Sequence, residues 1–154
     1  MKNSLLTLLI GFSGLNIWAS SDAVAAVPQA RELSFQLRGG HLIVIKGSIS
    51  ELEELNCVID TGASRTLVTR RIAGKLKLKS TSERLASVGK NLSLKGGMIP
   101  ELRLGEVHFT AVPAFVVRGD LLPGRVDVLV GIDLLKQTNL GVDFVAKTLT
   151  FGRD

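Results

Sequence analysis

The segment VIDTGAS, residues 58–64, decides how this chain is interpreted. Its first two residues continue an alternation of apolar and polar side chains that begins at Leu55, which predicts a strand ending at Asp60. Gly62 then lets the backbone turn sharply beside the carboxylate. The triplet Asp-Thr-Gly arises by chance in about three of every hundred chains of this length. Its meaning therefore depends on the residues around it.

The composition favours a single all-β domain. The chain has 154 residues, of which 45% are hydrophobic and 16 are glycines. This length is enough to bury one core and too short for two ordinary domains. Val, Ile, Leu and Thr are frequent, and long stretches rich in Ala, Glu and Lys are absent, so strands are expected to dominate.

The N-terminal residues have the layout of a secretory signal peptide. Lys2 precedes an apolar run at residues 5–18, and small residues follow at 23–26. A retained membrane anchor is the alternative, although the run is shorter than the roughly 20 residues of a spanning helix. Cleavage after Ala25 fits the small-x-small rule best, and cleavage after Ser20 or Ala26 also satisfies it.

The expected organisation follows from that layout. Residues 1–25 form a signal peptide, residues 26–31 a linker and residues 32–154 one folded domain. The domain is expected to be periplasmic or secreted, with no stable membrane span after signal removal.

The single cysteine, Cys57, rules out an internal disulfide. Because it alternates with Leu55 and Ile59 on the predicted strand, we interpret it as a small buried hydrophobic residue. An intermolecular disulfide or a reactive thiol is the alternative. His41 and His108 are isolated and lack the spacing of metal ligands, so neither a metal site nor a cofactor is expected.

The net charge is +5, and residues 1–25 contribute nothing to it because they hold one Lys and one Asp. Six basic residues lie between positions 65 and 79. They could attract an anionic surface or acidic substrates, or they could simply form a solvated helix face. No aromatic residues are interleaved with them, so we expect no nucleic acid partner.

Apolar alternation and turn residues predict a series of hairpins, with turns at 39–40, 50–54, 105–106 and 146–147. A short helix is expected over Arg70–Leu76 with Thr69 as its N-cap, and a helical turn over residues 132–137. Residues 80–97 are polar and glycine-containing, which predicts a long hairpin that acts as a flap with Gly89 and Lys90 at its tip. A plain surface hairpin is the alternative.

A second segment extends the pattern. VDVLVGIDLL, residues 126–135, is an apolar strand that ends in Gly131 and continues into a short helix, and the segments VDF and TLTF follow it. With VIDTGAS before them, these segments resemble the retropepsin-like aspartic proteases, the single-domain relatives of pepsin, and especially their exported bacterial members. The resemblance runs from about Glu32 to the C-terminus. It implies a small closed acid-protease barrel, half of a pepsin fold, with one or two short helices.

The resemblance also implies a reaction. Asp60 would activate a water for attack on a peptide carbonyl while a second aspartate polarises that carbonyl. This chain has only one such motif, so the second carboxylate must come from a second copy, which makes a homodimeric endopeptidase acting on peptide or protein substrates. Two other interpretations remain: a catalytically idle domain of the same fold that binds peptides or serves assembly, and an unrelated exported β-domain with a chance triplet.

Other acidic residues of the chain are possible partners of Asp60. Asp133 follows Gly131 at the start of a predicted helix, where exposed backbone N–H groups favour a carboxylate, so it is assigned a structural role. Asp127 and Asp143 are interpreted as polar residues that flank strands.

The residues after Asp60 receive roles from the resemblance. The Thr61 hydroxyl would bond across the dimer axis, and the Gly62 N–H would point toward the carboxylate. Ala63 and Ser64 would contact substrate, as would Gly89 and Lys90 of the flap. Because Ala63 has no hydroxyl to stabilise an ionised aspartate, we expect activity at mildly acidic pH rather than at about pH 2.

Overall fold

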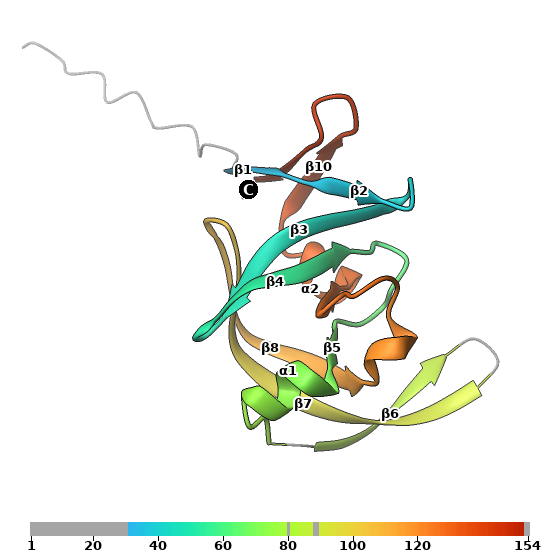
Figure 1. Ribbon diagram of the computed structural model, residues 1–154. Helices are drawn as coiled ribbons and strands as arrows, with labels where there is room; N and C mark the ends of the chain where they lie inside the picture. The colour runs from blue at the N-terminus through green and yellow to red at the C-terminus, as the bar shows by residue number, and fades with distance from the viewer. Residues whose placement is uncertain (1–30, 80, 88–89, 153–154) are drawn as a thin grey trace, which may run out of the picture.

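The computed structural model describes residues 31–79, 81–87 and 90–152, and for residues 81–87 and 90–93 only the backbone is described. Nearly every element is a strand (Figure 1). The strands are β1 (Arg31–Ser34), β2 (Gln36–Arg38), β3 (Leu42–Ile49), β4 (Leu52–Ile59), β5 (Leu67–Thr69), β6 (Thr81–Ser87), β7 (Lys90–Leu104), β8 (Val107–Val117), β9 (Val128–Val130), β10 (Asn139–Asp143) and β11 (Thr148–Gly152). The helices are α1 (Arg70–Lys75), α2 (Ile132–Leu135) and the 3-10 turn η1 (Gly119–Leu121).

The larger sheet closes into a barrel, as the sequence predicts. Its strand order is β2-β3-β4-β9-β5-β8-β7-β6, and an additional pairing of β3 with β7 joins the sheet to itself. That closure consists of Ser48 opposite Arg103 and Ile49 opposite Leu102. The smaller sheet, β1-β11-β10, lies beside the barrel and carries the end of the chain (Figure 1). The fold is therefore the all-β acid-protease half-fold.

Gly47 makes the closure possible. A Cβ atom at this position would lie 2.8 Å from the carbonyl oxygen of Arg103 and 2.8 Å from Sγ of Cys57. Real Cβ atoms do not approach other heavy atoms this closely, so β3 can run against β7 only with glycine at this position.

Two apolar clusters fill the molecule. The larger one occupies the barrel and includes Cys57 and Ile59 of β4, Val128 and Val130 of β9, and Leu134 of α2. Cys57 is fully buried, which raises the pKa of its thiol to about 12, mainly through desolvation and further through the nearby Asp127 carboxylate. The interpretation of Cys57 as a buried hydrophobic residue is confirmed.

The second cluster lies on the other face of β4 and β9, and we call it the apolar floor. Its buried members are Val44, Val58, Val117, Leu122, Val126 and Leu129. Partly buried Leu42, Ala63, Leu67 and Leu94 pack against them. Since alternate residues of a strand face opposite sides, Val58 and Asp60 project to the same side of β4. The catalytic candidate therefore stands on the floor side of the sheet.

Several predicted boundaries need correction. The turn between β3 and β4 is Ser50–Glu51 rather than 50–54, because Ile49 pairs with Leu52 and the acidic residues 53 and 54 already belong to β4. Their side chains face solvent and bind cations of neighbouring strands, Glu53 to Arg103 and Glu54 to Lys46. A run of charges looks like a loop in sequence, yet it also suits the outer face of a strand.

Arg31, expected in the linker, is already part of β1 and pairs with Phe151. The predicted hairpin of residues 33–45 also divides in two, because β1 joins β11 while β2 pairs with β3. Buried Phe35 lies between them, and its backbone N–H donates to the carbonyl of Lys147 at 2.9 Å.

The helices are close to their predicted positions. Thr69 is the N-cap of α1, but its side chain makes no capping bond and its buried hydroxyl has no hydrogen-bond partner. The helical turn over 132–137 is shorter than expected, since α2 ends at Leu135. Within the part of the chain that the structure describes, no helix is long and apolar enough to cross a membrane.

Asp143 was wrongly interpreted as a simple strand-flanking residue. Its Oδ1 accepts hydrogen bonds from the backbone N–H groups of Val145 and Ala146, both at 2.8 Å, and so it builds the turn between β10 and β11. This turn leaves Phe144 and Val145 exposed.

Candidate active site

Asp60 stands one residue beyond the end of β4, and two interactions fix its backbone and carboxylate. Its backbone N–H donates to the carbonyl of Val130 at 3.0 Å, which extends the parallel pairing of β4 with β9 by one step. The N–H of Gly62 donates to Oδ1 of Asp60 at 2.8 Å, in the orientation expected from sequence. The side chain is only partly buried. A partly exposed carboxylate on a rigid strand end can accept a proton from a water molecule.

The loop after Asp60 packs directly on Gly131. A Cβ atom at Gly131 would lie 2.6 Å from the backbone carbon and oxygen of Arg65 and 2.9 Å from the carbonyl oxygen of Ala63. The next residue, Ile132, donates its N–H to that same Ala63 carbonyl at 2.8 Å. The two sequence segments that carried the resemblance are therefore in contact, and only glycine fits between them.

Thr66 and Asp133 join the loop to α2. The buried Thr66 donates its backbone N–H to Oδ2 of Asp133 at 3.0 Å and its hydroxyl to Oδ1 at 2.8 Å. The Thr66 hydroxyl also accepts the N–H of Gly131 at 3.2 Å. Oδ1 of Asp133 also accepts the N–H of the next residue, Leu134, at 3.0 Å. These bonds agree with the structural role assigned to Asp133, and they occupy the carboxylate with neighbours other than Asp60.

The other candidate site residues differ in exposure and in whether the structure describes them. Thr61, Gly62 and Ser64 are exposed beside Asp60, while Ala63 is partly buried against the apolar floor. Lys90 begins β7, opposite Ser87 of β6, so the long hairpin predicted for this region is present. Gly89 and the side chain of Lys90 lie outside the described residues. Leu94 of β7, in this hairpin, packs against the apolar floor.

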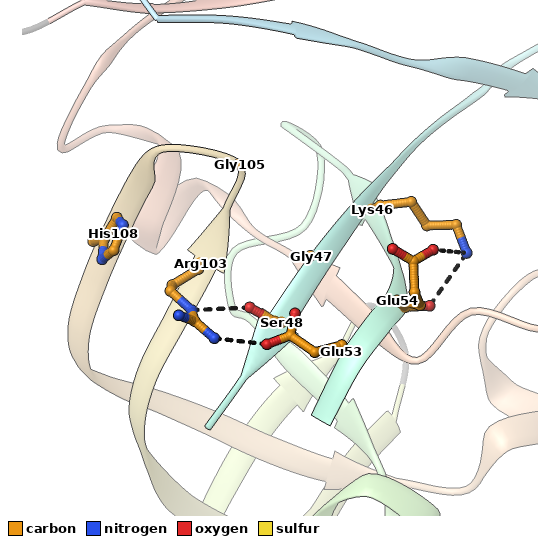
Figure 2. A pocket seen from close by; sticks show the side chains of 8 residues that line it. All are labelled: Lys46, Gly47, Ser48, Glu53, Glu54, Arg103, Gly105 and His108. Carbon is orange, nitrogen blue, oxygen red and sulfur yellow. Dashed lines mark hydrogen bonds and ion pairs between the residues drawn. The ribbon is translucent and has the colours of Figure 1, made fainter. Parts of the chain in front are cut away.

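Three pockets lie elsewhere on the surface, and none of them contains Asp60 or residues 61–64. One, of about 340 Å³, lies where β3, β4 and the β7–β8 turn meet (Figure 2). Its charges are paired: Arg103 bonds Ser48 at 3.0 Å and Glu53 at 2.8 Å, and Lys46 lies 3.4 Å from Glu54 (Figure 2). This pairing of charges does not indicate a catalytic role for the pocket.

The sequence interpretation missed a polar network at the start of β9. Asp127 is 8% exposed, and its carboxylate accepts the guanidinium of Arg71 and the backbone N–H of Asn56. The signal available in sequence was an acidic residue inside an apolar run, which requires a partner when buried. Nothing in sequence indicated Arg71 as that partner, since it lies 56 positions away.

No group of three or more His, Cys, Asp or Glu side chains that could hold a metal ion occurs in the described ranges.

A family model described as aspartyl protease matches residues 45–134, more than half of the chain. The chain belongs to the aspartyl protease family. The matched region begins in β3 and ends in α2, so it includes Asp60, Gly131 and the parallel pair of strands that joins them. No curated protein matches the chain.

Solved structures of this family share the fold. A retropepsin-like aspartic protease from Rickettsia conorii is 21% identical, with a TM-score of 0.58 over 80% of this chain and 92% of its own. The EIAV protease in complex with the inhibitor HBY-793 is 18% identical, with a TM-score of 0.51 over 66% of this chain and 91% of its own. The retroviral protease-like domain of Ddi1 from Leishmania major is 16% identical, with a TM-score of 0.50 over 72% of this chain and 92% of its own. At these identities, the likeness establishes the retropepsin-like fold alone.

Proposed function

We propose that this chain is an aspartic endopeptidase whose active site forms between two copies, each of which supplies one Asp60. The observation that carries the proposal is the placement of Asp60 at a strand end in an aspartyl protease fold: its partly exposed carboxylate accepts the N–H of Gly62, and its backbone N–H donates to the Val130 carbonyl.

The chemistry requires two carboxylates in different protonation states. The ionised Asp60 of one copy removes a proton from water as the water oxygen attacks the peptide carbonyl carbon, and the protonated Asp60 of the other copy donates to the carbonyl oxygen. The Asp60 that took the water proton then gives it to the amide nitrogen, and the other Asp60 recovers a proton from a hydroxyl of the gem-diol. The C–N bond breaks, which releases an amine and a carboxylic acid and restores both Asp60 side chains. Two like charges at short distance disfavour double ionisation, so the pair retains the single proton that this cycle needs.

We infer that a second copy supplies the partner carboxylate. Asp133 and Asp127, the buried or half-buried acids near β9, are already bound to Thr66 and Arg71 respectively. Ile132, whose N–H binds the catalytic loop at Ala63, is 39% exposed, and Thr61 of that loop is also exposed. We propose that these residues contact the second copy around a two-fold axis that passes close to Asp60.

The apolar floor supports a preference for substrates with apolar side chains near the scissile bond. Ala63 and Leu67 are partly exposed members of it, and Ala63 is three residues from Asp60. An apolar substrate side chain placed over them would gain about 25 cal/mol for each Å² that it buries.

We further propose that residues 1–25 direct export, which places the mature domain in the periplasm or outside the cell. The test is expression of the full chain in a bacterial host, followed by cell fractionation and mass measurement of the product. A full-length cytoplasmic product would contradict the proposal, and a full-length membrane-bound product would favour a retained anchor.

Cleavage of apolar peptides by mature protein, with the Asp60→Asn variant beside it, tests the function. Wild-type activity should be inhibited by a statine-type compound, and the rate per chain should fall on dilution as dimers dissociate. Unchanged cleavage by the variant would end the proposal. An inactive wild-type protein that is still dimeric would favour the catalytically idle peptide-binding domain.

A further inference from the structure

Asp127 makes an unusual number of connections for one residue. Its backbone N–H donates to the carbonyl of Asn56 at 2.9 Å, and its carbonyl accepts the N–H of Thr69 at 3.0 Å. Its carboxylate accepts the N–H of Asn56 at 3.0 Å and also binds the guanidinium of Arg71. One residue thus ties the loop before β9 to β4 on one side and to the start of α1 on the other.

These bonds hold a buried charge in place. The side chain of Asp127 is 12% exposed, whereas that of Arg71 is 57% exposed, so the arginine reaches inward from the surface to a largely desolvated carboxylate. Removing either partner would leave the other without its ionic contact, and the penalty falls mainly on the buried carboxylate. The Arg71–Asp127 pair therefore holds this part of the fold in place.

The Arg71–Asp127 pair lies on the floor side of the sheet. Asn56, Val58 and Asp60 alternate along β4 and share one face, and Asp127 shares a face with Leu129 in the same way. The next residue before Asp127 is Val126, which with Leu129 belongs to the apolar floor under Ala63. Asp60 is four positions beyond Asn56 along the chain, a distance of roughly 13 Å in a strand.

We propose, on the basis of the function proposed above, that Asp127 is a positioning residue for substrate recognition. Its bonds to Arg71 and Asn56 fix the positions of Val126 and Leu129. These two residues in turn support Ala63 and Leu67, which a substrate side chain would contact. Asp127 itself does not touch substrate. The carboxylate of Asp60 depends instead on the far end of β9, where Gly131 and Thr66 hold its loop.

Asp127→Asn tests this division of roles with little change of shape. Asparagine presents an oxygen on one side and an NH₂ group on the other, so it can accept from either Asn56 or Arg71 and must oppose the second donor. The floor should loosen while the Asp60 loop stays in place. We expect KM for an apolar peptide to rise about tenfold and kcat to change less than about twofold.

Arg71→Gln should give the same split, and the double variant should be no worse than either single variant, because both remove one interaction. Asp120→Asn is the matched control. Asp120 forms an exposed pair with Arg118, and hydrogen bonding to that arginine lowers the pKa of Asp120; among the described residues its carboxylate makes no bond to β4 or to the loop before β9. Its kinetics should equal those of the wild type.

Amide hydrogen exchange measured by NMR separates this proposal from the proposed function. In Asp127→Asn, exchange should accelerate at the N–H groups of Asp127 and Thr69 and stay unchanged at Asp60. Unchanged exchange at Asp127 and Thr69 would overturn the proposal, as would a fall in kcat with KM unaltered or wild-type kinetics in both variants. If wild-type protein cleaves no peptide, the proposed function fails, and substrate positioning by Asp127 fails with it. Accelerated exchange at Asp127 and Thr69 would then show only that Asp127 fixes the local structure.

Discussion

At the residue scale, Ala63 is the position through which the working pH can be changed. It is adjacent to the exposed Gly62 and its N–H lies 3.3 Å from the carbonyl of Asp60. A serine at this position would add a hydroxyl that can donate to the ionised carboxylate and stabilise it. Ala63→Ser should therefore move the acidic limb of the pH–rate profile of kcat/KM to lower pH. A limb that stays in place, or that moves to higher pH, would contradict this explanation.

Cys57 predicts a loss of stability in alkaline solution. Its pKa is raised from 9.0 to about 12 in the folded chain because burial disfavours the thiolate. The unfolded chain ionises first, so this contribution to stability is complete below pH 9.0 and is lost as the pH rises toward about 12. The free energy of unfolding should fall by up to about 1.4 kcal/mol per pH unit in that window.

Denaturant titrations of the wild type and of Cys57→Ala at several alkaline pH values check this. The variant should be less stable near neutrality because of the cavity, by up to about 2 kcal/mol. Its stability should fall less steeply above pH 9.0. Parallel pH dependences would show that the thiol is not responsible.

Individual residues also show which parts of the site could be predicted from the sequence and which could not. Asp60 and Gly62 were recognisable because a strand end and a turn are local features, and Gly131 was recognisable because its segment resembles the second signature of the retropepsin-like proteases. Asp127, Arg71 and Thr66 were not, because each matters through a partner more than fifty positions away. Short-range patterns contain no information about which distant side chain will fill a buried site.

At the element scale, β4 and β9 form the support of the site, and Gly131 is its tightest contact. Gly131→Ala would place a Cβ atom 2.6 Å from the backbone of Arg65, which cannot move as a flexible side chain does. We expect a loss of ~1–3 kcal/mol of stability and a marked fall in kcat, because the Asp60 loop must shift.

Gly74→Ala in α1 is the control for that substitution, since nothing lies within 4 Å of its Cβ position. It should be neutral or stabilise the chain by up to about 1 kcal/mol, because alanine favours the helix. Equal thermal unfolding of the two variants would contradict the tight contact at Gly131.

Most elements could be predicted from the sequence because apolar alternation is a local property. The hairpins around 39–40 and 105–106 followed from it, whereas the long β6–β7 hairpin followed from a polar, glycine-containing stretch. The closure of β3 on β7 and the separation of β1 from β2 did not, because strand partners depend on the whole topology. The charged start of β4 was mistaken for a loop because exposed strand faces and loops share the same composition.

At the scale of the whole molecule, the proposed function requires two copies of the chain, each supplying half of a site. Asp60 is partly exposed, its neighbours 61, 62 and 64 are exposed, and the pockets described above lie away from it. Sequence reasoning reached the need for a second copy through the single motif in a short chain. The geometry that would bring two copies together is not encoded in any local pattern.

Mixing wild-type and Asp60→Asn chains tests directly whether activity depends on a second copy. Wild-type protein is held at constant concentration, Asp60→Asn protein is added in increasing amounts, and cleavage is measured after subunit exchange. If each site needs two Asp60 carboxylates, mixed dimers are inactive, so an equal amount of variant should reduce activity to about half and a large excess should abolish it. Activity that is independent of the added variant would contradict the account.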